Sequence, residues 1–149
     1  VQWLPESEFN RKFKPIGETK QLGSSVWGAG IHTDHNNVSV THQEWIDPDP
    51  SDDGDKPTYL PNGHYYAIDA GEKTTEIHFQ NGPVKDNGVN GVTSEALLAI
   101  LVHRTKILNG NFPCDENKRA ITYMENALAL FEKRTKDRLN RGVEGQNKV

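Results

Sequence analysis

The chain has 149 residues, of which 34% are hydrophobic and 26% are charged, and its net charge is −4. This length suits one domain with a modest core, and the polar composition predicts irregular segments or a core completed by oligomerisation. The lone cysteine, Cys114, excludes an intrachain disulfide and favours a reducing compartment. We recognise no signal peptide, and no apolar run approaches the roughly 20 residues of a membrane span.

The two halves of the chain carry opposite charge. Residues 1–93 hold 7 Lys/Arg against 14 Asp/Glu, whereas residues 94–149 hold 10 against 7. A duplex-DNA binder normally has a broader basic face, so this pattern favours a small anionic ligand. The basic excess is densest at Lys133, Arg134, Lys136, Arg138 and Arg141.

The first half is predicted to be mainly β-structure. Alternating apolar residues predict strands over 24–33 and 36–46, with a hairpin turn at 34–37. A β-hairpin is predicted over 64–69 and 74–80. The intervening segments are predicted to be an acidic loop at 47–56, a turn at 61–63, and, before the first strand, an irregular amphipathic arm over 1–23.

Two helices are predicted to form an antiparallel hairpin after the Gly/Asn-rich loop 81–92. The first starts near Ser94, with Thr93 or Ser94 as its N-cap, and runs to about Leu108. Its apolar residues on several sides predict burial on more than one face. The second runs from about Asp115 to Arg141. It carries a seam of apolar residues at spacings of three and four, which are Ile121, Met124, Leu128 and Phe131.

The base of this hairpin is a candidate anion site. Glycines in the loop let backbone approach a phosphate, and a helix N-terminus offers free N–H groups. Arg134 and Arg138 share one helix face and can grip phosphates or stack on a base, and Phe79 can stack on a base. Each feature also has a structural interpretation: an ordinary strand-to-helix connection, a solvated charged face and a core phenylalanine, respectively.

Metal and catalytic signals are weak. Residues 49–54 imitate half of a calcium loop, but Leu60 occupies the position of the required bidentate glutamate. His32, His35 and His42 lack a second ligand pair and are expected to be surface histidines rather than a zinc site. His78 and His103 are the candidates for a general base in a phosphodiesterase, although His78 is expected to face away from Phe79. We expect no metal, no cofactor and no catalytic residue.

Part of the chain resembles a known family. The segments GHYYAID, TTEIHFQNGPVKDNGVNGVTSEALLAILVHR and EKRTKDRLNRGVEG are similar to phage proteins that sequester immune cyclic nucleotides. These are the Thoeris anti-defence sponges, which share a helical-hairpin domain with anti-CBASS sponges. The resemblance covers about residues 63–149, and residues 1–62 carry no recognisable motif and depart from the compact β-part that the family leads us to expect.

The resemblance implies a non-catalytic homo-oligomer, with dimers assembled into a hexamer, in the cytoplasm of an infected bacterium. It implies capture of glycocyclic ADP-ribose-type signals between protomers and, in some members, of cyclic di- or trinucleotides. Phe79 would stack on the base, Asn90 would be a polar loop contact, and Arg134 and Arg138 would close over the ligand from a neighbouring protomer. The predicted ligand-binding residues are Phe79, Gln80, Asn81, Asn90, Thr93, Arg134, Arg138 and Arg141.

The predicted fold class is therefore α+β, an antiparallel β-region followed by a two-helix hairpin in a homo-oligomer. The expected parts are an extended N-terminal region (1–62), a β-hairpin with its loop (63–93) and the helical hairpin (94–149). Two other functions stay open: an enzyme that degrades the same nucleotides, and a structural phage module whose hairpin only oligomerises. The residues do not specify the preferred nucleotide, the number of sites, or a role for residues 1–62.

Overall fold

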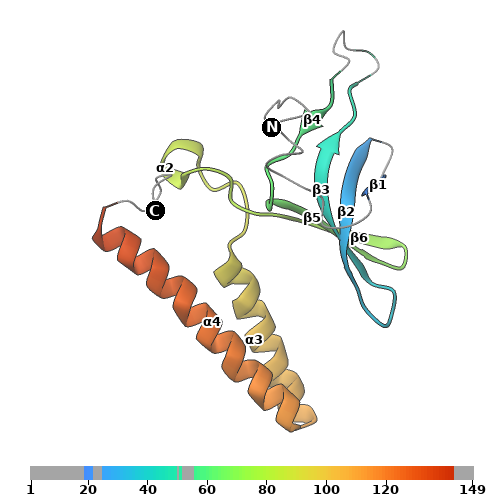
Figure 1. Cartoon of the computed structure of the whole chain (residues 1–149). Coiled ribbons are helices and arrows are strands. Elements are labelled where there is room, and N and C mark those ends of the chain that lie inside the picture. Colours follow the sequence, from blue (N-terminus) through green and yellow to red (C-terminus); the bar gives the residue numbers. More distant parts are fainter. Residues whose placement is uncertain (1–18, 22–24, 50, 52–55, 143–149) are drawn as a thin grey trace. The chain divides into compact units, whose positions relative to one another are not determined.

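The structure is a computed structural model, and it describes residues 19–21, 25–49, 51 and 56–142. The chain forms two compact units, a β unit (Val1–Phe79) and a helical unit (Gln80–Val149). An antiparallel sheet makes up the first, and an antiparallel helix pair dominates the second (Figure 1). The predicted α+β class is confirmed.

Within the described part of the β unit, six antiparallel strands form the sheet. They follow the order β1-β2-β3-β5-β6, and β4 also pairs with β3. The predicted strands and the later β-hairpin are confirmed, but β1 and β4 were not predicted because they have only three and two residues. The strands are β1 (Thr19–Gln21), β2 (Val26–Thr33), β3 (Ser39–Ile46), β4 (Thr58–Tyr59), β5 (Tyr65–Ala70) and β6 (Lys73–His78).

The predicted turn between β2 and β3 is confirmed. The Asp34 carboxylate accepts hydrogen bonds from the backbone N–H groups of Asn36 (2.8 Å) and Val38 (3.0 Å). Asn37 adopts φ 60°, a left-handed conformation that asparagine tolerates better than most residues. These hydrogen bonds lower the pKa of Asp34, because they stabilise its charged form. Of the predicted N-terminal arm, only residues 19–21 are described, and they form a strand; the rest lies outside the described residues.

Strand β3 contains a run of buried polar residues. Its pairing with β2 shifts between Trp27 and Gly28, which leaves Glu44 as an extra residue on β3. Thr41 and Glu44 are completely buried, and among the described residues neither the threonine hydroxyl nor the glutamate carboxylate has a hydrogen-bond partner. Burial raises the pKa of Glu44, because desolvation disfavours the charged carboxylate.

His42 corrects one prediction, because it is buried rather than on the surface. Its Nε2 accepts a hydrogen bond from the backbone N–H of Gly63 at 2.9 Å, and its ring lies 5.4 Å from that of Tyr66. Burial lowers the pKa of His42. The residue therefore ties β3 to the turn before β5 as a neutral imidazole.

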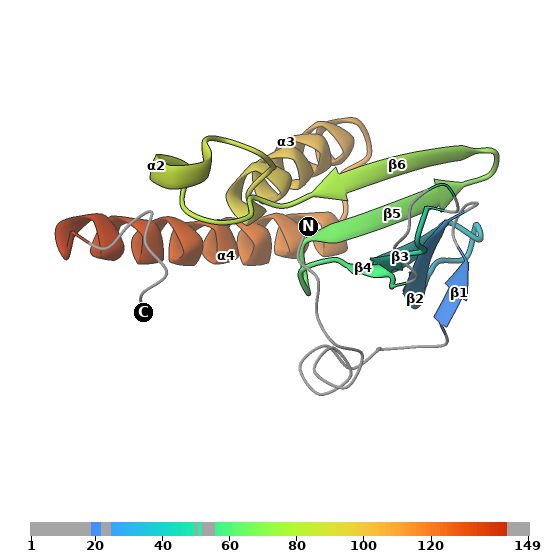
Figure 2. The same ribbon diagram turned by 90° about the horizontal axis from the view of Figure 1, so that it is seen from above.

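Three helices form the helical unit: α2 (Val84–Asn87), α3 (Ser94–Asn111) and α4 (Asp115–Asn140). Seen from above, α3 and α4 run alongside each other as the predicted hairpin (Figure 2). The short helix α2 corrects the prediction of a wholly irregular loop. Helix α3 also ends three residues later than predicted, because Phe112 caps it with a backbone hydrogen bond to Leu108.

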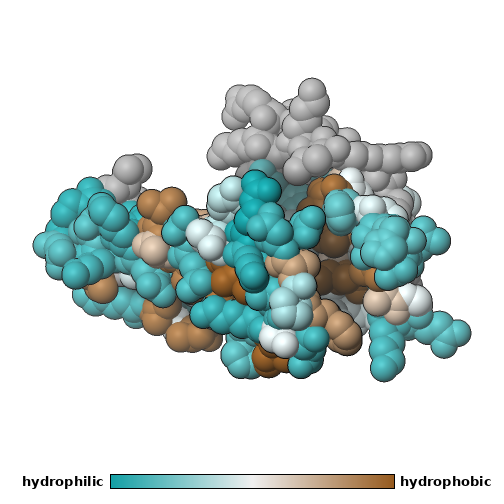
Figure 3. All heavy atoms as spheres, turned by 90° about the horizontal axis from the view of Figure 1, so that it is seen from below, coloured by the Kyte–Doolittle hydropathy of each residue, from teal (hydrophilic) through white to brown (hydrophobic). Residues whose placement is uncertain are grey.

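The prediction that α3 is buried on more than one side is wrong for the single chain, because only Val102 of this helix is buried. Ile100 is 61% exposed and Ile107 is 53% exposed. Apolar patches interrupt the hydrophilic surface of the helical part on the face seen from below (Figure 3). Within the described chain, neither long helix has an apolar stretch sufficient to cross a membrane.

Candidate functional site

Hydrogen bonds of Gln80 connect the beginning and the end of the loop between β6 and α3. The Gln80 backbone N–H donates to the carbonyl of Val92 (3.0 Å), and its side-chain oxygen accepts from the backbone N–H of Asn90 (2.9 Å). Its side-chain nitrogen donates to the carbonyls of Gly82 (3.2 Å) and Gly88 (2.8 Å). The Gln80 side chain thus connects the two ends of the loop segment that contains α2.

Asn90 makes a second clamp beside the first. Its side-chain oxygen accepts from the backbone N–H of Asn81, and its side-chain nitrogen donates to the carbonyl of Asn81, both at 2.8 Å. The structure therefore brings three predicted site residues together, Gln80, Asn81 and Asn90. Their amides hold the loop in shape, although Asn90 retains one N–H and one oxygen lone pair for another partner.

Two glycines give the loop its conformation. Gly82 has φ 80° and Gly88 has φ 68°, and they flank α2 on either side. A Cβ at position 82 would lie 2.4 Å from the side-chain nitrogen of Asn87. Both glycines are therefore required by backbone conformation, and a side chain at position 82 would in addition displace the amide of Asn87.

Thr93 is the N-cap of α3, as predicted. Its hydroxyl accepts a hydrogen bond from the backbone N–H of Ala96 at 3.2 Å. Glu95 adds a negative charge in the first turn. Both features complement the positive end of the helix dipole, so part of the predicted anion-binding capacity is already used within the chain.

Phe79 belongs to the β unit, in contrast to the other seven predicted site residues. It is half-buried, and its ring meets that of Tyr66 edge to face with centroids 5.8 Å apart. Its backbone N–H donates to the carbonyl of His64 at 2.7 Å. His78 instead contacts the ring of Tyr65 at 4.6 Å, which agrees with the expected opposite orientation of these neighbouring residues.

The predicted arginines occupy the last turns of α4. Arg134 and Arg141 are exposed, whereas Arg138 is only 8% exposed, the one buried residue of this helix. Asp137 pairs with Lys133 at 2.7 Å rather than with Arg134. Positive charge at a helix C-terminus is stabilised by the helix dipole, which explains part of this clustering without a ligand.

The 81–92 loop and the arginines of α4 are the two parts of the predicted site within the helical unit. They lie at the same end of that unit. Both ribbon views draw α2 and the last turns of α4 at this end (Figures 1 and 2). An antiparallel hairpin produces this arrangement, because α4 returns toward the residues where α3 began. The prediction that the basic end of α4 runs back toward the 81–92 loop agrees with both views.

A groove of about 340 Å³ runs between α3 and α4, but its chemistry does not suit a phosphate. Val102 and Leu128 contribute apolar surface, while Glu125 and Glu132 contribute two acidic side chains. Glu125 pairs with Lys106 at 3.6 Å. Because the remaining carboxylate repels an anion, the groove is a poorer nucleotide site than the basic end of α4.

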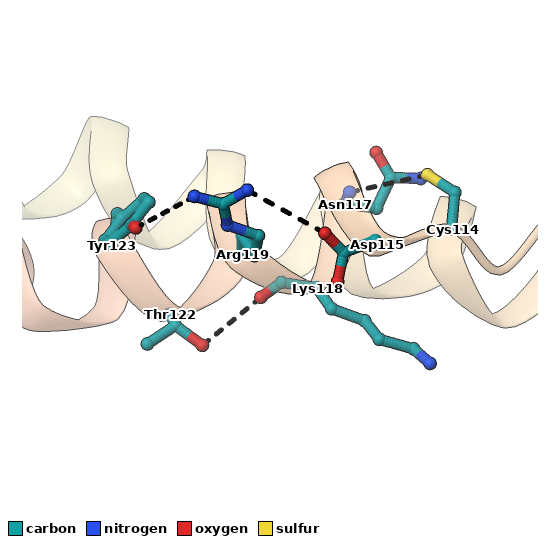
Figure 4. Close-up of polar contacts among 7 residues, drawn as sticks. All are labelled: Cys114, Asp115, Asn117, Lys118, Arg119, Thr122 and Tyr123. Carbon is teal, nitrogen blue, oxygen red and sulfur yellow. Dashed lines mark hydrogen bonds and ion pairs between the residues drawn. The ribbon is translucent and has the colours of Figure 1, made fainter.

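A polar cluster at the start of α4 was not predicted. Arg119 lies between the carboxylate of Asp115 (3.8 Å) and the hydroxyl of Tyr123 (3.5 Å), as Figure 4 shows. Cys114 caps the helix by accepting a hydrogen bond from Asn117 N–H at 3.4 Å. These side chains are one helical turn apart, so this cluster stabilises the first turns of α4.

The described residues contain no group of three or more metal-binding side chains. His78 lies 3.6 Å from the carboxylate of Glu76, and both side chains are exposed. His103 lies on the wall of the α3–α4 groove. Neither histidine forms part of a nucleophile–base arrangement among the interactions of the described residues.

Comparison with known proteins finds a family similarity over the second half of the chain. Residues 72–136 match the family model of the Acb2/Tad1 hairpin domain. The matched range runs from the turn before β6 into α4, so the similarity to this family covers the 81–92 loop and most of the helix pair. This range contains the whole loop and Arg134, whereas Arg138 and Arg141 lie beyond the matched range.

A relative from Bacillus phage SBSphiJ7, named "Thoeris anti-defense 1", is 46% identical over 74 residues. The aligned segment is 49% of this chain and 52% of that protein, so the chain spans about half the length of the curated relative it matches. The resemblance found in the loop and helix motifs is therefore confirmed, and the family match also includes β6, the last strand of the β unit.

Proposed function

We propose that this protein is a non-catalytic sponge that binds a cyclic nucleotide immune signal and keeps it from its receptor. The observation that carries this proposal is the 46% identity, over 74 residues, to a phage protein named for Thoeris anti-defence. The protein would act in the cytoplasm of an infected bacterium. Its ligand would be a cyclic ADP-ribose isomer of the glycocyclic type, with cyclic di- and trinucleotides as further ligands.

The chemistry of the hairpin base supports an anionic ligand. Arg134, Arg138 and Arg141 gather positive charge on one helix end, and charged hydrogen bonds to phosphate are among the strongest that side chains form. The loop that begins at Gln80 is closed by hydrogen bonds within the chain itself. A pre-organised site loses less entropy on binding, which favours the tight binding that sequestration needs.

The proposed sponge is a homo-oligomer, with dimers assembled into a hexamer and each ligand held between protomers. Exposed apolar residues on α3, such as Ile100 and Ile107, support association, because surfaces of this kind are typical of interfaces. A pocket completed by a second protomer also explains how a small hairpin can enclose a nucleotide.

Sequestration requires slow release as well as affinity. Differences in affinity among related complexes arise mainly from the dissociation rate. We therefore expect the protein to carry its ligand through a desalting column. Native mass spectrometry of protein incubated with cyclic ADP-ribose isomers and cyclic di- and trinucleotides tests this directly.

The expected result is retention of a cyclic ADP-ribose isomer at a fixed ratio to protomers. Retention of no member of this panel would overturn the proposal and favour a purely structural module. Linear ADP-ribose serves as the control, since it has the same phosphates without the ring.

A further inference from the structure

The side chain of Gln80 has no spare donor. A primary amide carries two N–H donors, and both are used, toward the carbonyls of Gly82 and Gly88. Its oxygen already accepts from Asn90 N–H at 2.9 Å. A ligand can gain a hydrogen bond from this amide only if a carbonyl of the loop loses one.

The side chain of Gln80 holds three groups of the loop: the carbonyls of Gly82 and Gly88 and the backbone N–H of Asn90. Gly82 and Gly88 have positive φ angles and flank α2, so each is a position where the chain can rotate with little steric cost. Asn90 lies on the returning segment. A single side chain therefore connects both glycines with the returning segment at Asn90.

We propose that Gln80 is a positioning residue: it holds the 80–93 loop in its binding conformation, and other groups of the site contact the ligand. The inference rests on the proposed function, since it concerns the same loop. It changes the predicted role of Gln80 from a direct ligand contact to a support for neighbours such as Asn90, whose amide has an N–H to spare.

Loss of this support lowers the population of the binding conformation. A ligand that binds only one conformation shows an affinity reduced by the fraction of protein in that conformation. The association rate falls by the same fraction, whereas the dissociation rate of the bound state changes little. Removal of a direct contact has the opposite signature, since it raises the dissociation rate.

The test uses the full chain with Gln80→Met, which keeps the side-chain length and removes the amide. Asn87→Ala is the matched control, because it removes a different amide of the same loop, one that makes a single 3.3 Å bond to the Pro83 carbonyl. Hydrogen exchange without ligand is measured first. We expect exchange of residues 80–93 to rise by about tenfold in Gln80→Met, with α3 and α4 unchanged and the control close to wild type.

Binding kinetics with glycocyclic ADP-ribose as the probe are measured next. The expected result for Gln80→Met is an association rate reduced by about tenfold and a dissociation rate within about twofold of wild type. Unchanged exchange together with a faster dissociation rate would show a direct contact and overturn the proposal. If Gln80→Met does not fold, Gln80→Ala is measured in the same way.

The two proposals fail separately. If wild-type protein binds no nucleotide probe, the proposed sponge function falls, but hydrogen exchange still decides whether Gln80 fixes the loop. If the probe binds and Gln80→Met exchanges like wild type, the positioning role falls while the sponge function stands.

Discussion

The two units differ in how completely they bury their own side chains. In the β unit, the fully buried large side chains are the polar Thr41 and Glu44. In the helical unit, Val102 and Arg138 are the buried residues of the two long helices, while apolar residues such as Phe112 and Leu130 are 77% and 68% exposed. The difference teaches that the sheet encloses its own interior, whereas the hairpin leaves apolar surface for another molecule to cover.

The largest effect is expected when the exposed apolar surface of the helical unit is made charged. Ile100→Glu combined with Ile107→Glu places two charges on the exposed apolar stripe of α3. Burying each isoleucine at an interface contributes about 1.5–3 kcal/mol, so the double variant is expected to dissociate into single chains. Analytical ultracentrifugation measures the mass of the assembly.

The control for this experiment is Asn126→Glu, an exposed polar position on α4, which is expected to leave assembly intact. Nucleotide retention is measured on the same samples. A wild-type protein that is already monomeric at working concentrations would contradict the proposed oligomer.

The next effect concerns the basic end of α4. Arg134→Ala with Arg138→Ala is expected to weaken nucleotide binding by at least roughly 100-fold, because each charged hydrogen bond contributes about 1.5–3 kcal/mol. Lys133→Ala with Lys136→Ala removes the same charge from the same helix and is expected to cost far less. Isothermal titration calorimetry compares the two, and equal losses would point to net charge rather than to these arginines.

A smaller effect is expected at Phe79, which stands at the boundary of the β unit. Phe79→Leu keeps apolar volume and removes the ring face. Stacking of a base on an aromatic ring is worth about 1–3 kcal/mol, so we expect a loss of roughly 5- to 150-fold in affinity. The variant Tyr66→Phe keeps the ring that Phe79 contacts and is expected to bind normally. If Phe79→Leu also binds normally, Phe79 is only a packing residue.

The buried Glu44 gives the β unit a specific pH dependence. Its pKa is raised above the ordinary value of 4.5 by burial, so its contribution to stability is fully present below that pH and is lost as pH rises through the raised pKa. Glu44→Gln removes this titration. The gain in stability of the variant over wild type is therefore expected to be near zero at about pH 4 and to grow toward about pH 7.

Tryptophan fluorescence during urea unfolding measures this effect in the β unit alone, because all three tryptophans lie between residues 1 and 79. The pKa of Asp34 is lowered, so its contribution to stability changes with pH in the direction opposite to that of Glu44. It is present in both proteins, so it cancels in the difference. A difference between Glu44→Gln and wild type that does not change with pH would show that Glu44 is not held as the neutral acid.

The sequence predicted the regular elements well, because they follow local rules. Alternation predicted β2 and β3, and Thr93 predicted the start of α3 as a cap. Helix α2 was missed because one turn of helix has no period to detect. The burial of His42 and Glu44 was missed because it depends on which strands come together, and on a register shift beside Trp27, which no local pattern records.

The sequence predicted which residues cluster in the candidate site better than it predicted what each residue does there. The clustering of Gln80, Asn81 and Asn90 followed from their proximity in the chain, but their mutual hydrogen bonds depend on the return of the loop at Val92. The burial of Arg138 beside two exposed arginines likewise has no counterpart in helical spacing alone.

The most direct test of the central claim asks what happens to the signal after it is bound. The protein is loaded with glycocyclic ADP-ribose, freed of excess nucleotide by desalting, and denatured by heat, and the released small molecule is identified by chromatography and mass spectrometry. The sponge account predicts intact signal, equal in amount to what was bound, even after long incubation. Release of a linear or hydrolysed product would contradict it and identify the protein as an enzyme that degrades the signal.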